Sequence, residues 1–204
     1  MTLIIFILGM LIGAAFERNK LDEVEQYYAK SEVLFMDLYA LNDRIDSQAE
    51  TCGVLINTTI ELADNIYEEA FLLEKYDNSG KITEGLRIVH RKYDMLRTLL
   101  WMNSIKISEK CKGDFNAVVY LYEYDSKDLA KKATQNVWGR LLFDLKQEKG
   151  NKILLIPIAV NSDLISLDAL IEPFGIRKIP AVVIDETYVI EELSSVEDLK
   201  IYLD

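Results

Sequence analysis

The hydrophobic periodicity of this chain changes once, and that change limits what the chain can fold into. Between residues 18 and 112, apolar side chains recur every three or four positions, as they do along one face of an α-helix. Between residues 113 and 204, short apolar runs alternate with helical stretches, as they do in a sheet that is covered by helices. The sequence therefore predicts an α+β protein, in which a helical part precedes an α/β part.

The chain opens with an uninterrupted apolar run, Leu3–Phe16. The run is shorter than the roughly 20 residues that usually cross a bilayer, but Arg18 and Lys20 can reach the headgroups. We expect residues 1–17 to form a hydrophobic signal anchor, which would make this a single-pass membrane protein with its C-terminal body outside the cytoplasm. A cleaved signal peptide and a buried helix are the alternatives. The two basic residues alone favour a cytoplasmic body, so the orientation stays open.

Residues 18–112 are predicted to form a helical, coiled-coil-like stalk. A heptad seam runs from Leu21 to Ile45, with Ser31 and Asn42 as its two polar positions. The seam fits packing within the chain, which we favour, and it also fits a dimeric coiled coil. A homodimer is therefore an open alternative.

Two further helices are expected over about residues 50–75 and 82–110, joined by a turn at 77–80. Helices joined by so short a turn pack antiparallel, which brings Cys52 and Cys111 to the same end of the hairpin. We predict a disulfide between them, which would indicate an oxidising compartment. The alternative is two buried free thiols.

The composition argues against several kinds of site. The formal net charge is −11 and no basic stripe is visible, so we expect no nucleic-acid binding. The two cysteines and the single histidine, His90, lack metal-ligand spacing. We expect no metal, no cofactor and no catalytic residue, and we interpret His90 as an ordinary helix residue.

The C-terminal part, residues 113–204, reads as strand, helix, strand, helix, strand, strand, helix. Its strands are rich in β-branched and aromatic residues, and the near-continuous second one is typical of a strand covered on both faces. Ser126 is a candidate N-cap for the first of these helices. The expected strands cover 117–122, 152–160, 181–185 and 188–191, and the expected helices cover 127–148, 163–172 and 195–203.

This element order, together with the segment Phe174–Asp185 (FGIRKIPAVVID), resembles the thioredoxin-like superfamily. In that family a helix ends at an aromatic–glycine pair, and a cis-proline opens the next strand after a short link. Pro180 matches that proline, so the resemblance implies a cis Ile179–Pro180 bond. The resemblance covers the last ninety or so residues.

The chain departs from the family at its redox centre. Active members carry a CxxC motif after the first strand, where the helix N-terminus lowers the thiol pKa. The corresponding positions here are Ser126, Lys127, Asp128 and Leu129. No histidine lies in this part of the chain to activate Ser126 as a nucleophile. The resemblance thus implies a domain that is inactive in thiol exchange.

The family also pairs extended polypeptide with the backbone beside its cis-proline, by strand addition. The resemblance implies such a peptide groove here, and its alternative is a fold kept only as a structural module. We therefore expect a membrane-anchored, redox-inactive binding or scaffold protein with an unidentified protein or peptide partner. The alternative is a degenerate thiol–disulfide oxidoreductase, or its subunit, that uses Cys52 and Cys111. The groove candidates are Tyr124, Asp125, Ser126, Ile179 and Pro180.

Overall fold

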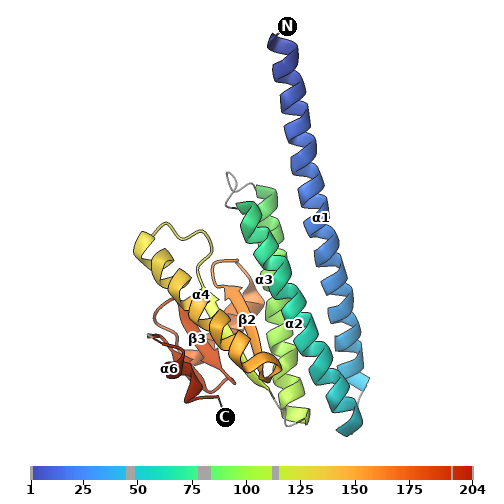
Figure 1. The fold of residues 1–204 in the computed structure, drawn as a ribbon. Helices are drawn as coiled ribbons and strands as arrows, with labels where there is room; N and C mark the ends of the chain where they lie inside the picture. Colours follow the sequence, from blue (N-terminus) through green and yellow to red (C-terminus); the bar gives the residue numbers. More distant parts are fainter. Residues whose placement is uncertain (1, 45–48, 78–83, 112–114, 194, 204) are drawn as a thin grey trace.

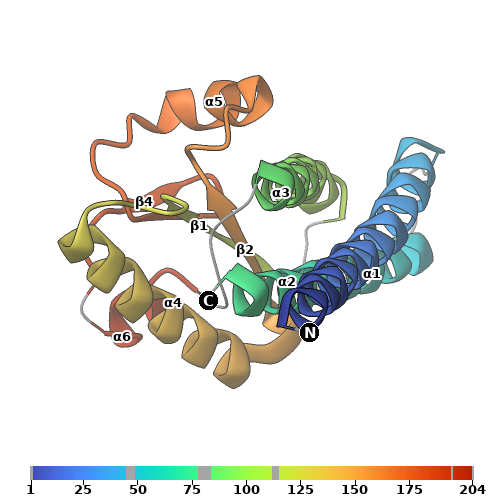
Figure 2. The ribbon, with the colours of Figure 1, turned by 90° about the horizontal axis from the view of Figure 1, so that it is seen from above.

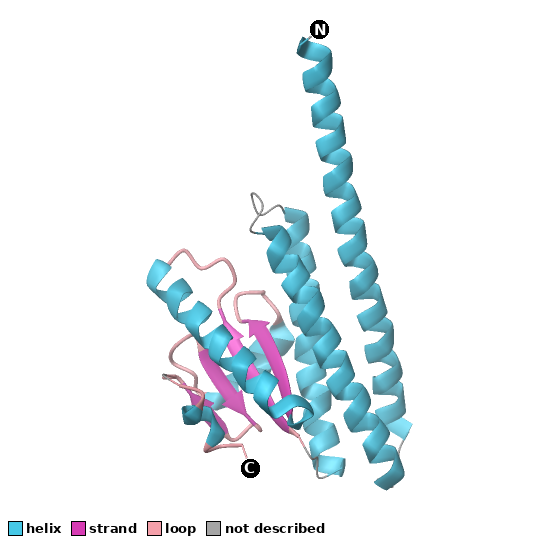
Figure 3. Cartoon of the chain, in the orientation of Figure 1, coloured by secondary structure: helices cyan, strands magenta, loops and turns pink. Residues whose placement is uncertain are grey.

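The computed structural model describes residues 2–44, 49–77, 84–111, 115–193 and 195–203. Three long helices come first, and a four-stranded sheet flanked by shorter helices follows (Figures 1 and 3). The predicted α+β class is confirmed in this respect.

The long helices are α1 (Thr2–Arg44), α2 (Ala49–Asp77) and α3 (Glu84–Cys111). They lie side by side, and the N-terminal part of α1 extends beyond the other two (Figure 1). Central positions of the heptad seam, such as Phe35 and Leu38, are buried in the core that α1 shares with α2 and α3. This part of the seam therefore packs within the chain, as favoured. The side chains of Leu21, Asn42 and Ile45 and the turn at 78–80 lie outside the described residues.

The predicted membrane anchor is wrong. Among the described residues, no helix combines the length and the apolar character that crossing a bilayer demands. The run Leu3–Phe16 would extend only about 21 Å along a helix, against a hydrocarbon core about 30 Å thick. It ends at Glu17 and Arg18, and α1 continues from there to Arg44 as one helix. The membrane helix over residues 1–17 and the single-pass location with an extracytoplasmic body are therefore not supported.

A buried polar cluster joins the three helices. The Ser31 hydroxyl of α1 lies 3.0 Å from both carboxylate oxygens of Glu69 in α2. The Tyr93 hydroxyl of α3 donates to the same carboxylate at 3.1 Å. Burial raises the pKa of Glu69, although these hydrogen bonds oppose the shift. The polar seam position Ser31 thus has a role inside the bundle.

The sheet has the strand order β2-β1-β3-β4. Strand β2 runs parallel to β1, β3 runs antiparallel to β1, and β4 runs antiparallel to β3. Helix α4 (Leu129–Lys149) makes the crossover between the two parallel strands, as parallel pairing requires. The strands are β1 (Asn116–Tyr122), β2 (Ile153–Ala159), β3 (Ala181–Ile184) and β4 (Tyr188–Ile190).

Helices cover both faces of the sheet (Figure 2). On one face, Val118 and Tyr120 of β1 pack with Trp138 of α4 and with α6 (Glu197–Lys200). On the other face, Val119 and Leu121 share a core with α3 and with α5 (Ile165–Ile171). That second core continues into α1 and α2. Both faces of the central strands are therefore dry, which accounts for their near-continuous apolar sequence.

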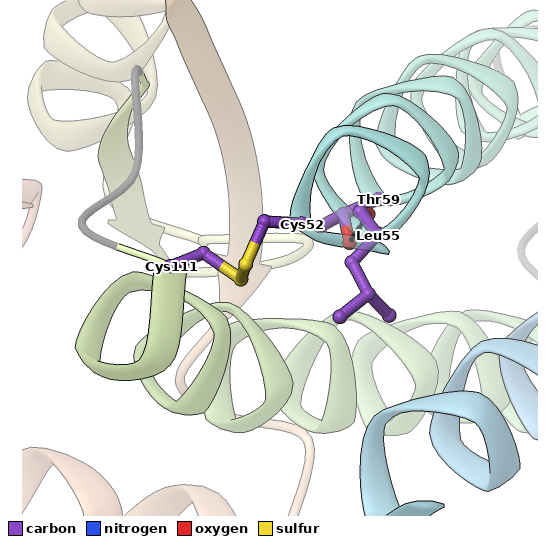
Figure 4. Close-up of a disulfide and its surroundings, with 4 residues drawn as sticks. All are labelled: Cys52, Leu55, Thr59 and Cys111. Carbon is purple, nitrogen blue, oxygen red and sulfur yellow. Dashed lines mark hydrogen bonds between the residues drawn. A yellow bond between two sulfur atoms is a disulfide. The ribbon is translucent and has the colours of Figure 1, made fainter. Parts of the chain in front are cut away.

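The predicted disulfide is confirmed. Cys52, near the start of α2, is bonded to Cys111, the last residue of α3, and their Cα atoms lie 5.4 Å apart (Figure 4). About two turns further along α2, the Thr59 hydroxyl donates to the carbonyl of Leu55 at 2.7 Å. The disulfide closes the hairpin at the end where α3 leads into the sheet.

We expect a Cys52→Ser/Cys111→Ser variant to lose about 4 kcal/mol of unfolding free energy, because the bond closes a 59-residue separation. Urea unfolding followed by circular dichroism measures this loss. Reductant should destabilise the wild type by a similar amount and leave the variant unchanged. Equal stability of the two proteins under oxidising conditions would contradict the prediction.

We also expect Glu69→Gln to change the pH dependence of stability. A carboxyl whose pKa is raised by folding is held more favourably when protonated, so its stabilising contribution is present below its unfolded pKa and is lost as the pH rises through its folded pKa. The variant lacks this titration. The stability difference between variant and wild type should therefore shift in favour of the variant between acidic and neutral pH. Urea unfolding at several pH values tests this, and a pH-independent difference would contradict it.

Candidate functional site

The carboxyl ends of β1 and β2 and the start of β3 meet at one edge of the sheet. Leu121 pairs with Ala181, so the next position of the register sets Pro180 opposite Tyr122, the last residue of β1. The Ile179–Pro180 bond is cis, as expected. The loop that follows β1 begins at this same edge. The five predicted groove residues thus come to one end of the sheet from two segments.

The loop after β1 is fixed by two amide side chains. Asn161, which follows β2, accepts from the backbone N–H of Tyr124 and donates to its carbonyl, both at 2.8 Å. Gln135 of α4 makes the same pair of contacts with Glu123, both at 3.0 Å. Each amide satisfies one donor and one acceptor, as an added residue of a strand would. The backbone leading into the candidate groove is therefore held in one conformation.

The opposite segment is also held. The Glu191 carboxylate accepts from the backbone N–H groups of Arg177 and Lys178, the latter at 2.8 Å. The Arg177 bond and then the Lys178 bond lower the pKa of Glu191, so the carboxylate stays charged at neutral pH. Ile179 is half-buried and Pro180 is buried. Both sides of the candidate groove are thus preorganised.

A polar stripe on α3 contacts this edge. Arg87 forms an ion pair with Asp125 at 3.5 Å, and Arg91 donates to the carbonyl of Asp163 at 2.8 Å. Between them, the His90 ring lies 3.9 Å from the Tyr124 ring, centroid to centroid. Positions 87, 90 and 91 share one helix face. The helical part of the chain therefore supplies side chains to the loop after β1.

Asp125 occupies the left-handed backbone region, with φ of 48°. Its carboxylate accepts from the Lys127 ammonium at 2.7 Å, on the same oxygen that faces Arg87. The Lys127 hydrogen bond is the largest cause of the lowered pKa of Asp125. Asp125 is therefore ionised across the physiological range.

The prediction that Ser126 is the N-cap of α4 is wrong. Asp128 is the N-cap, and its carboxylate accepts from the N–H groups of Ala130 and Lys131 at 2.9 and 3.1 Å. A carboxylate is favoured at this position, because it accepts hydrogen bonds from the first N–H groups of the helix and its negative charge complements the helix dipole. The Ser126 side chain is only 7% exposed, and its hydroxyl has no hydrogen-bond partner among the described residues.

Sequence reasoning missed His90 as a residue of this site. The histidine lies 34 residues before Tyr124, in a different element, so no local pattern relates the two. A usable signal was present: Arg87, His90, Arg91 and Asp94 recur at helical spacing and so form a polar stripe along one face of the helix. Such a stripe indicates a face that packs against polar groups rather than against a core.

Asp94 continues the stripe into the interior. It is 2% exposed and accepts from the backbone N–H of Ala159 at 3.1 Å and from the hydroxyl of Ser162. Arg97 lies 3.3 Å from the same carboxylate and is itself buried. Burial raises the pKa of Asp94, against the opposing effect of Arg97. This pair fixes the end of β2 to α3.

The cysteines lie at the other edge of the sheet. Cys111 comes shortly before β1, and Pro180 lies beside its far end. Six steps of about 3.3 Å along β1 separate these edges by roughly 20 Å. The two sulfur atoms are also bonded to each other. The structure therefore does not bring a cysteine to the position where the CxxC motif would lie.

In the part of the chain that the structure describes, no group of three His, Cys, Asp or Glu side chains is arranged to hold a metal ion. No protein-family model, curated protein or solved structure matches the chain.

We expect Asp94→Asn to destabilise the protein by about 3–5 kcal/mol, because it leaves the buried Arg97 charge without its carboxylate. The double variant Asp94→Asn/Arg97→Met removes both charges and should be less destabilised than the single variant. Urea unfolding of wild type, both single variants and the double variant gives the coupling energy. Strictly additive losses of unfolding free energy would show that the two side chains do not stabilise each other.

Proposed function

We propose that this protein is a redox-inactive thioredoxin-like binding module, which holds an extended segment of a partner protein at the edge where β1 ends and β3 begins. The strand and helix order from β1 to α6 is the one that the resemblance to thioredoxins implies. The residues of the proposed groove are Tyr124, Asp125, Ser126, Ile179 and Pro180.

The observation that carries the proposal is the separation of the cysteines from this edge. The four positions of the missing motif, from Ser126 to Leu129, hold no thiol. The bonded pair Cys52–Cys111 lies roughly 20 Å away along β1. The edge is nevertheless held in place by Asn161 on one side and by Glu191 on the other. A fixed edge without its redox residues favours binding over thiol exchange.

Preorganisation supports the same conclusion. Binding an extended peptide costs free energy for every loop that must be ordered. Here the backbone of Tyr124 and that of Lys178 already have hydrogen-bond partners in the chain. Binding a partner would therefore require little additional free energy for ordering this surface, because the surface is already ordered in the folded chain.

The alternative, an oxidoreductase that uses Cys52 and Cys111, receives less support. Thiol exchange depends on a thiolate of lowered pKa that a substrate can reach. These two cysteines instead join two long helices that pack into one core. Their position is typical of a structural disulfide.

A selection from a displayed random peptide library, with the folded full chain as bait, tests the proposal. We expect selected peptides to lose at least about tenfold in affinity for Ile179→Glu, because a charge then lies where apolar surface is buried. Fluorescence anisotropy with a labelled selected peptide measures the affinity.

Ile165→Glu is the matched control, because Ile165 on α5 is 86% exposed and lies outside the proposed groove. Circular dichroism should show that both variants are folded. The proposal is wrong if selected peptides bind wild type and Ile179→Glu equally, or if no peptide is enriched over the control bait.

A further inference from the structure

The charge around the loop after β1 differs in sign from that of the whole chain. The chain has a formal net charge of −11. At this loop, three cations act on the single carboxylate of Asp125: Lys127, Arg87 and Lys132. Asp125 alone cannot neutralise these three cations, so the sign of the local charge depends on the neighbouring carboxylates.

The neighbouring carboxylates are already engaged elsewhere. Asp128 accepts from two backbone N–H groups at the start of α4. Glu123 forms an ion pair with Lys131. Together with Asp125 they supply three negative charges. The loop and its neighbours hold four positive charges, those of Arg87, Lys127, Lys131 and Lys132, so one positive charge is in excess here.

The surplus charge is accessible to a ligand. The side chains of Lys127 and Arg87 are 83% and 53% exposed. Their positions are nonetheless restricted, because both contact the same oxygen of Asp125. Lys127 also directly follows Ser126, one of the proposed groove residues. A ligand lying along the groove would pass these cations.

We propose that the groove prefers acidic extended peptides, whose aspartate or glutamate side chains pair with Lys127 and Arg87 at the loop after β1. This inference rests on the proposed function and names the chemical class of its partner. Complementary charge of this kind raises the association rate and selects among partners.

Three labelled peptides of equal length test the inference: alternating glutamate and threonine, alternating glutamine and threonine, and alternating lysine and threonine. The alternation favours an extended backbone and places the variable side chains on one side. Fluorescence anisotropy with the full chain should give the affinity order glutamate, then glutamine, then lysine. Added salt should lower the affinity for the glutamate peptide, because it screens exposed charge pairs.

Lys127→Glu should lower the affinity for the glutamate peptide roughly five- to tenfold, since an attraction becomes a repulsion. Lys127→Gln should give a smaller loss, and it keeps the inference testable if the charge reversal disturbs folding. Lys152→Glu is the matched control, because Lys152 lies just before β2, at the opposite edge of the sheet. That variant changes the net charge equally and should leave the affinity nearly unchanged.

Equal affinities for the three peptides, a preference for lysine, or no binding of the glutamate peptide at millimolar concentration would each overturn the inference. Equal losses in Lys127→Glu and Lys152→Glu would do so as well, because net charge alone would then explain them. The proposed function fails by a separate result, namely equal affinity of the library-selected peptides for wild type and for Ile179→Glu. A groove that depends on Ile179 but not on Lys127 would keep the function and remove its charge preference.

Discussion

The packing of α3 against the sheet is the interaction on which the rest of this structure depends. Helices α4 and α6 cover one face of the sheet, and the other face shares its core with α1, α2, α3 and α5. Without α3, the apolar side chains of Val119 and Leu121 would lose much of their cover. The helical part of the chain therefore shares a hydrophobic core with the sheet.

The same helix combines two kinds of contact along its length. Apolar residues such as Leu96 and Leu100 contribute to the shared core, while Arg87, His90 and Asp94 reach the loops that follow the parallel strands. Polar contacts cluster at the carboxyl edge because loop backbone is exposed there, whereas strand backbone is paired within the sheet. This division explains how one helix can stabilise the core and also shape the surface where we place the groove.

Much of this architecture could be predicted from local pattern. The periodicity of β1 and β2 indicated buried strands, and the short connection between α2 and α3 brought Cys52 near Cys111, where the bond is found. The membrane helix is a wrong prediction, because the apolar run Leu3–Phe16 is shorter than the roughly 20 residues that usually cross a bilayer. The last helix is shorter than predicted, since α6 covers only Glu197–Lys200. The contact of His90 with Tyr124 could not be predicted, because it depends on how two distant elements pack.

The contacts of α3 also reach a third connection. Trp101 donates from its indole nitrogen to the Glu186 carboxylate at 2.6 Å, in the turn between β3 and β4, and its ring stacks on Phe174 at a centroid distance of 5.8 Å. A single helix thus holds the segments after β1, after β2 and between β3 and β4. Any rotation of α3 about its own axis would shift all three together, so their motions should be correlated rather than independent. The connections of this sheet are mechanically one unit, although they are dispersed along the sequence.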